Sequence, residues 1–374
     1  MHQRLRPFTL ALLGLALITT SCAGRDTQQT DRAEYASFSR FTDPGEYTAM
    51  LDVLPHEPVE IASVAKNLTV HHNLLAYFGV PNEEWSEVRG VWPPKAPDAL
   101  AILGKTGPGD LLGNRQIKQR LRGACMSESH LLAAMLRHRQ IPVRIRAGYF
   151  RDVYTNETHL VAFWEKNARA KGVAKQLLDE DPERWREVNH EYTRQQVQAN
   201  KCVEHWVTEY WDRESETWRL LDANDTFLEA MSDIDVEFHL PRRYFEYAYE
   251  SWQKMRTAGD FNPDQYAEWP QDGRSHIRAQ LLWDFYSLLN HDIAGLDKSA
   301  WPNEGETTPE RDAYVFVKET EYGKVPAGEI AELDALARLM SKDPGIDVLM
   351  AFYLESRYLR IATMDADTYS FPAK

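Results

Sequence analysis

The chain has 374 residues, of which 43% are apolar, 27% charged and 11% aromatic, as in ordinary globular proteins. This length fits one large domain or two average ones. The formal net charge of −14 repels phosphate backbones and no basic stripe offsets it, so we expect no nucleic-acid partner. Three cysteines are too few for a disulfide framework, so each of them needs a separate explanation.

The first 21 residues have the pattern of a signal peptide. Arg4 and Arg6 precede an apolar run over residues 10–18, which is too short to span a membrane as a stable helix. The small residues before Cys22 resemble the lipobox of bacterial lipoproteins, in which the cysteine is lipidated. We therefore expect an exported domain, lipid-anchored through Cys22 to the periplasm-facing membrane surface of the bacterial cell envelope, with residues 22–33 as a polar tether. The alternative is ordinary cleavage that leaves Cys22 as a spare thiol.

The region up to residue 149 alternates helical patterns with proline and glycine breaks. Helices are expected near residues 47–54 and 61–78. Residues 125–140 form the clearest predicted helix, because apolar residues fall on one face and Pro142 ends it. Residues 143–149 alternate at period two, which predicts a strand.

The rest of the chain predicts an insertion, a hairpin and a helical region. Residues 165–200 are rich in charged and amide side chains and indicate an exposed helical insertion. Two strands are expected over residues 205–211 and 218–222. We divide the chain into a first domain over residues 34–240 and a helical C-terminal region over 241–374, which is either a separate domain or a cover. Helices are expected there over residues 243–257, 275–291, 329–340 and 345–362.

Cys125 follows Gly123 and Ala124 at the expected start of the helix that runs to residue 140. Unpaired backbone N–H groups and the positive end of the helix dipole both favour the thiolate, which is the nucleophilic form of cysteine. A lone cysteine is otherwise most often a small buried hydrophobe. The hairpin downstream favours the first interpretation.

The two predicted strands bring a histidine and an aspartate together. If residues 212–215 form the hairpin loop, His205 lies opposite Asp222. Opposed side chains have Cβ atoms about 4.5–5.5 Å apart, within reach of an imidazole–carboxylate hydrogen bond. Alternation also puts Val207 and Glu209 on the His205 face. A nucleophile, a base and a group that orients the base are the three parts of nucleophilic thiol catalysis.

These residues resemble the transglutaminase-like superfamily, whose fold is papain-like. The matching stretches are Gly123-Ala-Cys125, Ile141-Pro-Val-Arg144, Ala147-Gly-Tyr149, His205-Trp-Val-Thr-Glu-Tyr-Trp211 and Trp218-Arg-Leu-Leu-Asp222. In that superfamily the cysteine, histidine and aspartate of these motifs form the catalytic triad, which here implies Cys125, His205 and Asp222. The resemblance covers most of the chain but implies a chemistry rather than a substrate.

Cys202 lies three residues before His205 and needs its own explanation. On a regular strand it faces away from His205, whereas an irregular backbone would bring it near Cys125. A Cys125–Cys202 disulfide in an oxidising compartment would then inactivate the protein. The insertion over residues 165–200 absorbs the long interval between Cys125 and His205.

Other polar residues offer weaker alternatives. His159 is a rival base, but no aspartate follows it at hairpin distance, so we expect a structural role. His71 and His72 are adjacent, and adjacent helical residues point about 100° apart, so no metal site is expected. Glu209 is expected to pair with a surface arginine or lysine rather than to touch the site.

Together these patterns predict an α+β fold in which a catalytic helix packs on an antiparallel sheet, with helical additions before and after. We expect a thiol-dependent acyl-transfer enzyme acting on amide bonds of a protein, a peptide or a peptidoglycan stem peptide, by hydrolysis, with no cofactor or metal. The expected oxyanion donors are the Cys125 N–H and the side chain of Gln116 or Gln119. The alternatives are a cross-linking protein-glutamine transamidase and a non-catalytic envelope scaffold that binds peptides. The oligomeric state is left open.

Overall fold

The computed structural model describes residues 31–90, 95–170, 180–223, 225–232, 234, 236–267, 271–291 and 315–361. The predicted signal peptide and Cys22 lie outside them. The end of the predicted tether is different from the expectation, because residues 31–35 are helical and Tyr35 is buried in the core. Within the described part of the chain, no helix combines the length and the apolar character that crossing a bilayer requires.

The chain combines helices with two small sheets. The strands are β1 (Thr69–His71), β2 (Leu121–Gly123), β3 (Val143–Phe150), β4 (Val203–Asp212), β5 (Thr217–Leu221) and β6 (Phe245–Tyr247). The α-helices are α2 (Pro58–Leu68), α3 (Ala96–Leu103), α4 (Cys125–His138), α5 (Glu157–Ala170), α7 (Pro182–Gln198), α8 (Asp225–Met231), α9 (Ala248–Thr257), α10 (Gly273–Leu288), α12 (Ala327–Met340) and α13 (Ile346–Glu355). Short 3-10 segments include η1 (Gly45–Val53), η2 (His72–Leu74) and η4 (Ile117–Gln119), and a π-turn, η8, covers Val315–Glu319.

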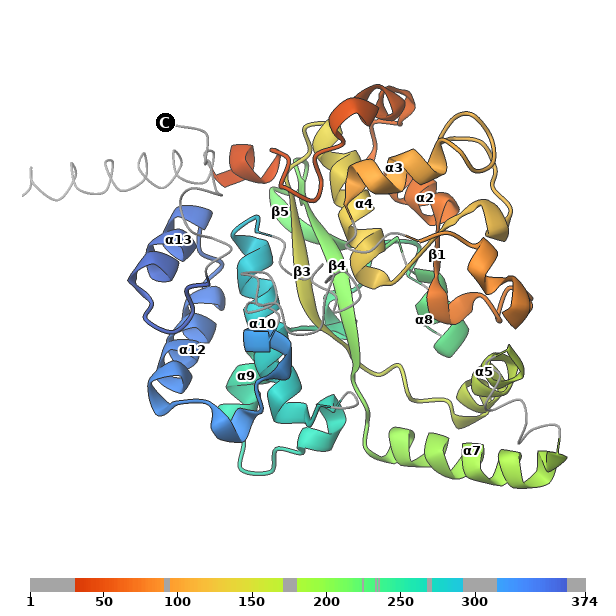
Figure 1. Cartoon of the computed structure of the whole chain (residues 1–374). Coiled ribbons are helices and arrows are strands. Elements are labelled where there is room, and N and C mark those ends of the chain that lie inside the picture. Colours follow the sequence, from red (N-terminus) through yellow and green to blue (C-terminus); the bar gives the residue numbers. More distant parts are fainter. Residues whose placement is uncertain are drawn as a thin grey trace, which may run out of the picture.

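The main sheet is antiparallel and has the strand order β5-β4-β3-β6. Strand β4 is central and pairs with β3 from Val203 to Tyr210. Helices α2, α3 and α4 lie on one side of these strands in Figure 1, and α9, α10, α12 and α13 lie on the other. This arrangement of helices around an antiparallel sheet agrees with the predicted α+β class.

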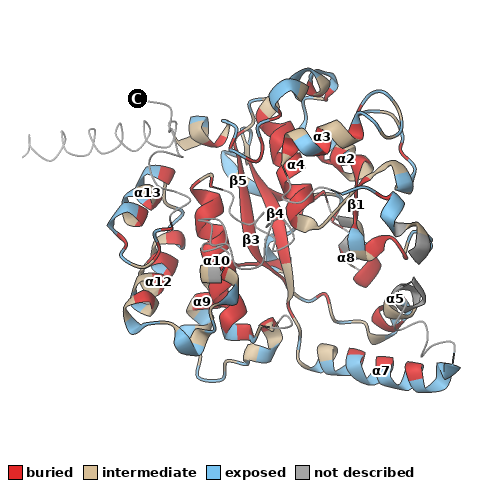
Figure 2. Cartoon of the chain, viewed as in Figure 1, coloured by how far each residue is buried: buried red, intermediate tan, exposed pale blue. Residues whose placement is uncertain are grey.

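The two faces of β4 enter two different hydrophobic clusters, as strand alternation requires. Trp206 and Tyr210 belong to the larger cluster, which also contains the apolar residues of α4 and α10. Val207 belongs to the smaller cluster, together with Phe150 of β3 and Leu220 of β5. The predicted alternation along residues 205–211 is therefore confirmed. Figure 2 shows that the strands, α4 and α10 are mostly buried, whereas α7 is mostly exposed.

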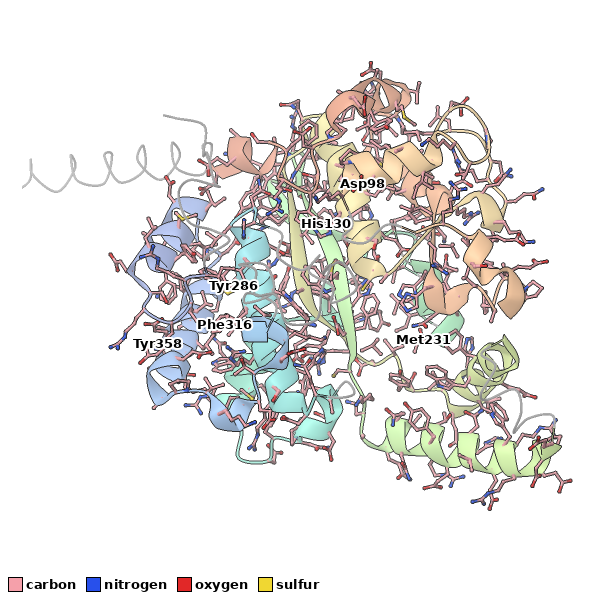
Figure 3. All side chains as sticks on the ribbon, in the orientation of Figure 1. Asp98, His130, Met231, Tyr286, Phe316 and Tyr358 are labelled. Atoms are coloured by element: carbon pink, nitrogen blue, oxygen red, sulfur yellow. The ribbon has the colours of Figure 1, made fainter. Side chains whose placement is uncertain are left out.

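The region after residue 240 shares the core of the first domain. Strand β6 extends the sheet by pairing with β3 from Gly148 to Phe150. Helix α10 packs along β3, and its apolar residues lie in one cluster with those of α4. Figure 3 labels His130 on α4 and Tyr286 on α10, which lie on either side of the strands in this view. The described residues of this region therefore cover the sheet rather than forming a core of their own.

The predicted elements agree best where the periodicity is strong. The predictions of α4, β3, β4, β5, α10 and α12 are confirmed within a few residues at each end. The prediction of one helix over residues 61–78 is wrong, because the chain leaves α2 at Leu68 to form β1 beside β2. The predicted helix over 243–257 begins as β6, and α13 ends at Glu355 rather than near 362. In the described part of the predicted insertion, α5 and α7 are helical, and α5 starts earlier than expected.

A buried network of charges ties β3 to its neighbours. Arg146 makes a paired contact with Asp284 of α10 and a third contact with Glu209 of β4. Arg144 contacts the same oxygen of Glu209 at 2.7 Å, and all four side chains are at least 95% buried. Burial alone would raise the pKa of Glu209, but the charges of Arg144 and Arg146 outweigh it and hold the pKa at about 2. Glu209 thus pairs with arginine as predicted, in the interior rather than on the surface.

We predict that Glu209→Gln destabilises the protein by about 3–5 kcal/mol at pH 7, because two buried guanidinium groups lose a shared partner. A carboxyl whose folded pKa of about 2 lies below its ordinary value of 4.5 stabilises the fold above pH 4.5 and loses that effect as the pH falls toward 2. The difference between wild type and variant in urea unfolding should therefore shrink when the pH is lowered from 7 to 3.5.

The matched control is Glu191→Gln, which neutralises an exposed carboxylate of α7 that is paired with Arg194. It should change the free energy of unfolding by less than about 0.5 kcal/mol. Equal stabilities of Glu209→Gln and Glu191→Gln at pH 7 would show that the buried network does not support the fold.

Candidate functional site

The short sheet β1–β2 delivers the chain to the start of α4. Gly123, the last residue of β2, pairs with His71 and its carbonyl meets Nδ1 of His72 at 3.1 Å. A Cβ atom at position 123 would lie 2.7 Å from the Cβ atom of Ser127, so only glycine allows this close approach. Cys125 is therefore the first residue of α4, as predicted, and is partly exposed.

The backbone of Trp206 in β4 contacts the first turns of helix α4. Ser129, one turn after Cys125, donates its hydroxyl to the Trp206 carbonyl at 3.1 Å. The Trp206 N–H lies close enough to the thiol of Cys125 to lower its pKa. The nucleophile candidate therefore lies against the strand position directly after His205.

His205 and Asp222 form the predicted pair. Nε2 of His205 lies 2.9 Å from Oδ2 of Asp222, and both side chains are at least 97% buried. The imidazole stacks on Phe150 with ring centroids 3.7 Å apart and an interplanar angle of 18°. Because a carboxylate only accepts hydrogen bonds, Nε2 carries a hydrogen and donates it to Asp222, so Nδ1 is the ring nitrogen that is left to exchange a proton with a reacting group.

The register that predicted this pair is wrong by two residues. Thr208 pairs with Leu221, and Asp212 pairs with Thr217, so the hairpin loop covers residues 213–216 rather than 212–215. The side chain of Asp212 caps this turn by accepting from the N–H of Glu214 and the hydroxyl of Ser215. Glu216 closes the loop with a φ of 50°.

A shift of two residues leaves every side chain on its predicted face. In the observed register Asp222 continues past β5 to a position diagonal to His205, where long side chains still meet. The N–H of Asp222 is fixed by a 2.8 Å hydrogen bond to the carbonyl of Phe238. The contact of His205 with Asp222 is therefore confirmed, although its derivation from direct opposition is not.

The electrostatics of Cys125 differ from the sequence-based expectation of a thiolate. Burial raises the pKa of the Cys125 thiol well above its ordinary value of 9.0, and the carboxylate of Glu204 raises it further. The Trp206 N–H lowers it, but does not offset these effects. No hydrogen bond joins Cys125 to His205 among the described residues. The resting site therefore holds a neutral Cys125 thiol.

Sequence reasoning missed a second histidine–carboxylate pair beside the site. Glu204 precedes His205 on β4 and lies on the Trp206 face, where its carboxylate meets Nε2 of His276 at 2.9 Å. Burial alone would raise the pKa of Glu204, but the charge of Lys318 and the His276 hydrogen bond hold it far below the usual range. Strand alternation places Glu204 on this face, but no local pattern connects it to His276 in α10.

The rival residues have other roles. His159 lies on α5, and its Nε2 meets the carbonyl of Ala230 at 3.0 Å. His71 and His72 stack at 4.6 Å and lie outside any α-helix, so the angular argument against their cooperation does not hold. Cys202 is free and buried and Cys125 is free and partly exposed, so the alternative of a disulfide between them is not realised.

Two further expectations concern the oxyanion donors and a metal ion. Gln116 and Gln119 cap each other's backbone N–H groups around η4, so their side chains already have local roles. Within the part of the chain that the structure describes, no three His, Cys, Asp or Glu side chains are grouped closely enough to hold a metal ion.

We predict that Cys125 is alkylated by iodoacetamide with a pH midpoint above 9, because burial and nearby carboxylates oppose the thiolate. Glu204→Gln should lower this midpoint, since it removes a negative charge next to the sulfur. Mass spectrometry of the Cys125 peptide measures the reaction separately from the other thiols. The control Glu229→Gln neutralises an exposed carboxylate on α8 and should leave the midpoint unchanged. A wild-type midpoint below 8.5 would contradict this account of the resting thiol.

Comparisons with protein-family models, with curated proteins and with solved structures found no match to this chain. The chemistry of the site is therefore argued from the geometry of Cys125, His205 and Asp222.

Proposed function

We propose that the protein is a thiol-dependent acyl-transfer enzyme of the transglutaminase-like superfamily, with a papain-like core and with Cys125, His205 and Asp222 as its triad. The observation that carries this proposal is the buried His205–Asp222 hydrogen bond next to a helix-start cysteine whose sulfur meets the strand at Trp206. A histidine with a purely structural role would not need a cysteine beside the next residue of its strand. The pair supplies a base and the group that orients it.

The mechanism starts from a protonated Cys125 thiol. Nδ1 of His205 accepts the thiol proton as the sulfur attacks a carboxamide or peptide carbonyl, so a C–S bond forms without a stable prior thiolate. Asp222 stabilises the imidazolium, and the Trp206 N–H stabilises the negative charge on sulfur. Catalytic hydrogen bonds are often long before substrate binds, which accommodates the missing contact between Cys125 and His205.

The remaining steps expel the amine and then release the acyl group from Cys125. The C–N bond breaks as His205 returns its proton to the leaving amine, which leaves a thioester on Cys125. The N–H of Cys125, unpaired at the first position of α4, is placed to donate to the oxyanion. Water then attacks the thioester and gives a carboxylic acid, whereas attack by an amine would give a transamidation product. We propose hydrolysis as the main outcome.

The proposed location narrows the substrate class. A signal peptide over residues 1–21 and lipidation of Cys22 would hold the domain at the periplasmic membrane surface. The substrates available there are envelope proteins, peptides and the stem peptides of peptidoglycan. No cofactor is required for this chemistry.

A second candidate is a non-catalytic peptide-binding scaffold with the same fold. The specific observation in its favour is the raised pKa of the Cys125 thiol, since a buried neutral thiol is the usual state of a structural cysteine. The two functions differ in whether Cys125 accepts an acyl group in a reaction that needs His205.

We predict that 4-nitrophenyl acetate acetylates Cys125 and that the thioester turns over. Cys125→Ser should abolish the Cys125 modification and the burst of nitrophenol, and His205→Ala should slow acetylation by about 10²–10⁴-fold because the general base is lost. Asp222→Asn should slow it at least tenfold, since the imidazole loses the partner that fixes its tautomer. Stopped-flow absorbance and mass spectrometry of the modified peptide measure these rates.

Matched controls are available for both residues. Cys202→Ser removes the other described thiol, and His159→Ala removes a histidine with a backbone partner outside the site. Both should keep the wild-type burst. If His159→Ala slows acetylation as much as His205→Ala, or if Cys125 stays unmodified in the wild type, the enzymatic proposal fails and the scaffold remains.

A further inference from the structure

A cavity of about 420 Å³ lies on the face of the sheet opposite α4. Its walls come from β3, β4, β5, the start of α9 and the residues that follow α12, including Ser341 and Asp343. This volume is within the range of about 300–1,000 Å³ that is usual for small-molecule sites. Along β4 the cavity begins at Glu209, four residues and about 13 Å from His205, so it is separate from the candidate active site.

The floor of the cavity carries hydrogen-bond donors that the protein does not use. Arg144 and Arg146 are about 95% buried, and each guanidinium has five N–H groups. Three N–H groups of Arg146 bond to Asp284 and Glu209. Three of Arg144 bond to Glu209 and Asp343. Among the described residues, two N–H groups of each arginine therefore lack a protein acceptor, which favours a ligand rich in oxygen acceptors.

The charges around the cavity exclude strongly charged ligands. The two arginines face the carboxylates of Glu209, Asp343 and Glu216 in the walls, with a further carboxylate bonded behind Arg146. This excess of carboxylates opposes an anion such as phosphate, and the guanidinium groups on the floor offer a cation no acceptor. A neutral ligand meets neither penalty. Exposed Asp343 can still accept hydrogen bonds, so the ligand should also donate.

Aromatic rings supply the remaining walls. Trp211, Trp218, Tyr247 and Tyr249 line the cavity. Arg144 already lies over the Trp218 ring at 3.9 Å and Arg146 over the Tyr247 ring at 4.1 Å, and Tyr249 stacks on Tyr247, so a ligand meets the remaining ring area. Such rings pack well against flat C–H surfaces and tolerate polar groups at their edges. We propose that this cavity binds a neutral saccharide, whose hydroxyl groups both donate and accept and whose ring presents C–H faces.

The test is isothermal titration calorimetry of the whole protein with three neutral tetrasaccharides: chitotetraose, cellotetraose and maltotetraose. At least one should bind saturably at millimolar or lower concentration. Ser341→Trp places an indole in the wall of the cavity and should weaken that binding at least tenfold. Thr217→Trp, on the opposite wall, should do the same and serves if the first variant fails to fold.

Lys342→Trp is the matched control, because its neighbour Ser341 lines the cavity whereas Lys342 is exposed and does not. It should keep the dissociation constant within twofold of wild type. The proposal is overturned if none of the three saccharides binds, or if binding survives both filling variants. It is also overturned if inorganic phosphate or choline, rather than a saccharide, occupies a site that Ser341→Trp closes. None of these outcomes depends on acyl transfer at Cys125.

Discussion

The pairing of Arg146 with Asp284 is the contact on which the arrangement of the whole chain depends. Strand β3 has β4 on one edge, but β6 covers only its last three residues on the other. Asp284 of α10 completes that edge, because its carboxylate accepts the Ala147 N–H as well as two N–H groups of Arg146. An unpaired buried N–H or guanidinium would be costly, so α10 has to dock at this position.

The docking of α10 has consequences at both ends of the sheet. Toward one end it brings His276 to Glu204, beside the residue whose N–H meets Cys125. Toward the other end it leaves Arg146 with unused donors on the floor of the saccharide cavity. The helical C-terminal region is therefore part of the architecture of both sites.

The alternation of side chains between the two faces of a strand explains how much of the site could be predicted from sequence. The alternation of apolar and polar residues in β4 specified which face His205 occupies, and an error of two residues in register leaves faces unchanged. The exact register depends on the Asp212 cap and on the left-handed Glu216, both of which are details of the turn. Contacts such as Glu204 with His276 join distant segments and follow only from tertiary packing.

The relative sizes of the electrostatic effects on Cys125 explain why the expected thiolate is not the resting state. The N-terminus of a helix favours a negative charge by about 0.3–1 kcal/mol. Burial of an ionisable group shifts its pKa by up to about 3–5 units, each worth about 1.4 kcal/mol. Cys125 also lies near Glu204, Glu128 and Asp222, all of which raise its pKa. The dipole argument had the correct sign, but it is the smallest of these effects.

A raised pKa therefore does not distinguish a catalytic thiol from a structural one in this chain. Burial also raises the pKa of Cys202, to about 12, and the carboxylate of Glu246 adds to it. What differs is the surroundings: Cys202 directs its thiol toward the Asn200 carbonyl, which cannot accept a proton. Cys125 instead lies against the strand position next to His205, an imidazole that is held by Asp222. Donors alone do not distinguish the two thiols, because the Tyr266 hydroxyl also lowers the pKa of Cys202. The position beside the His205–Asp222 pair, rather than acidity, therefore supports the proposal that Cys125 is the nucleophile.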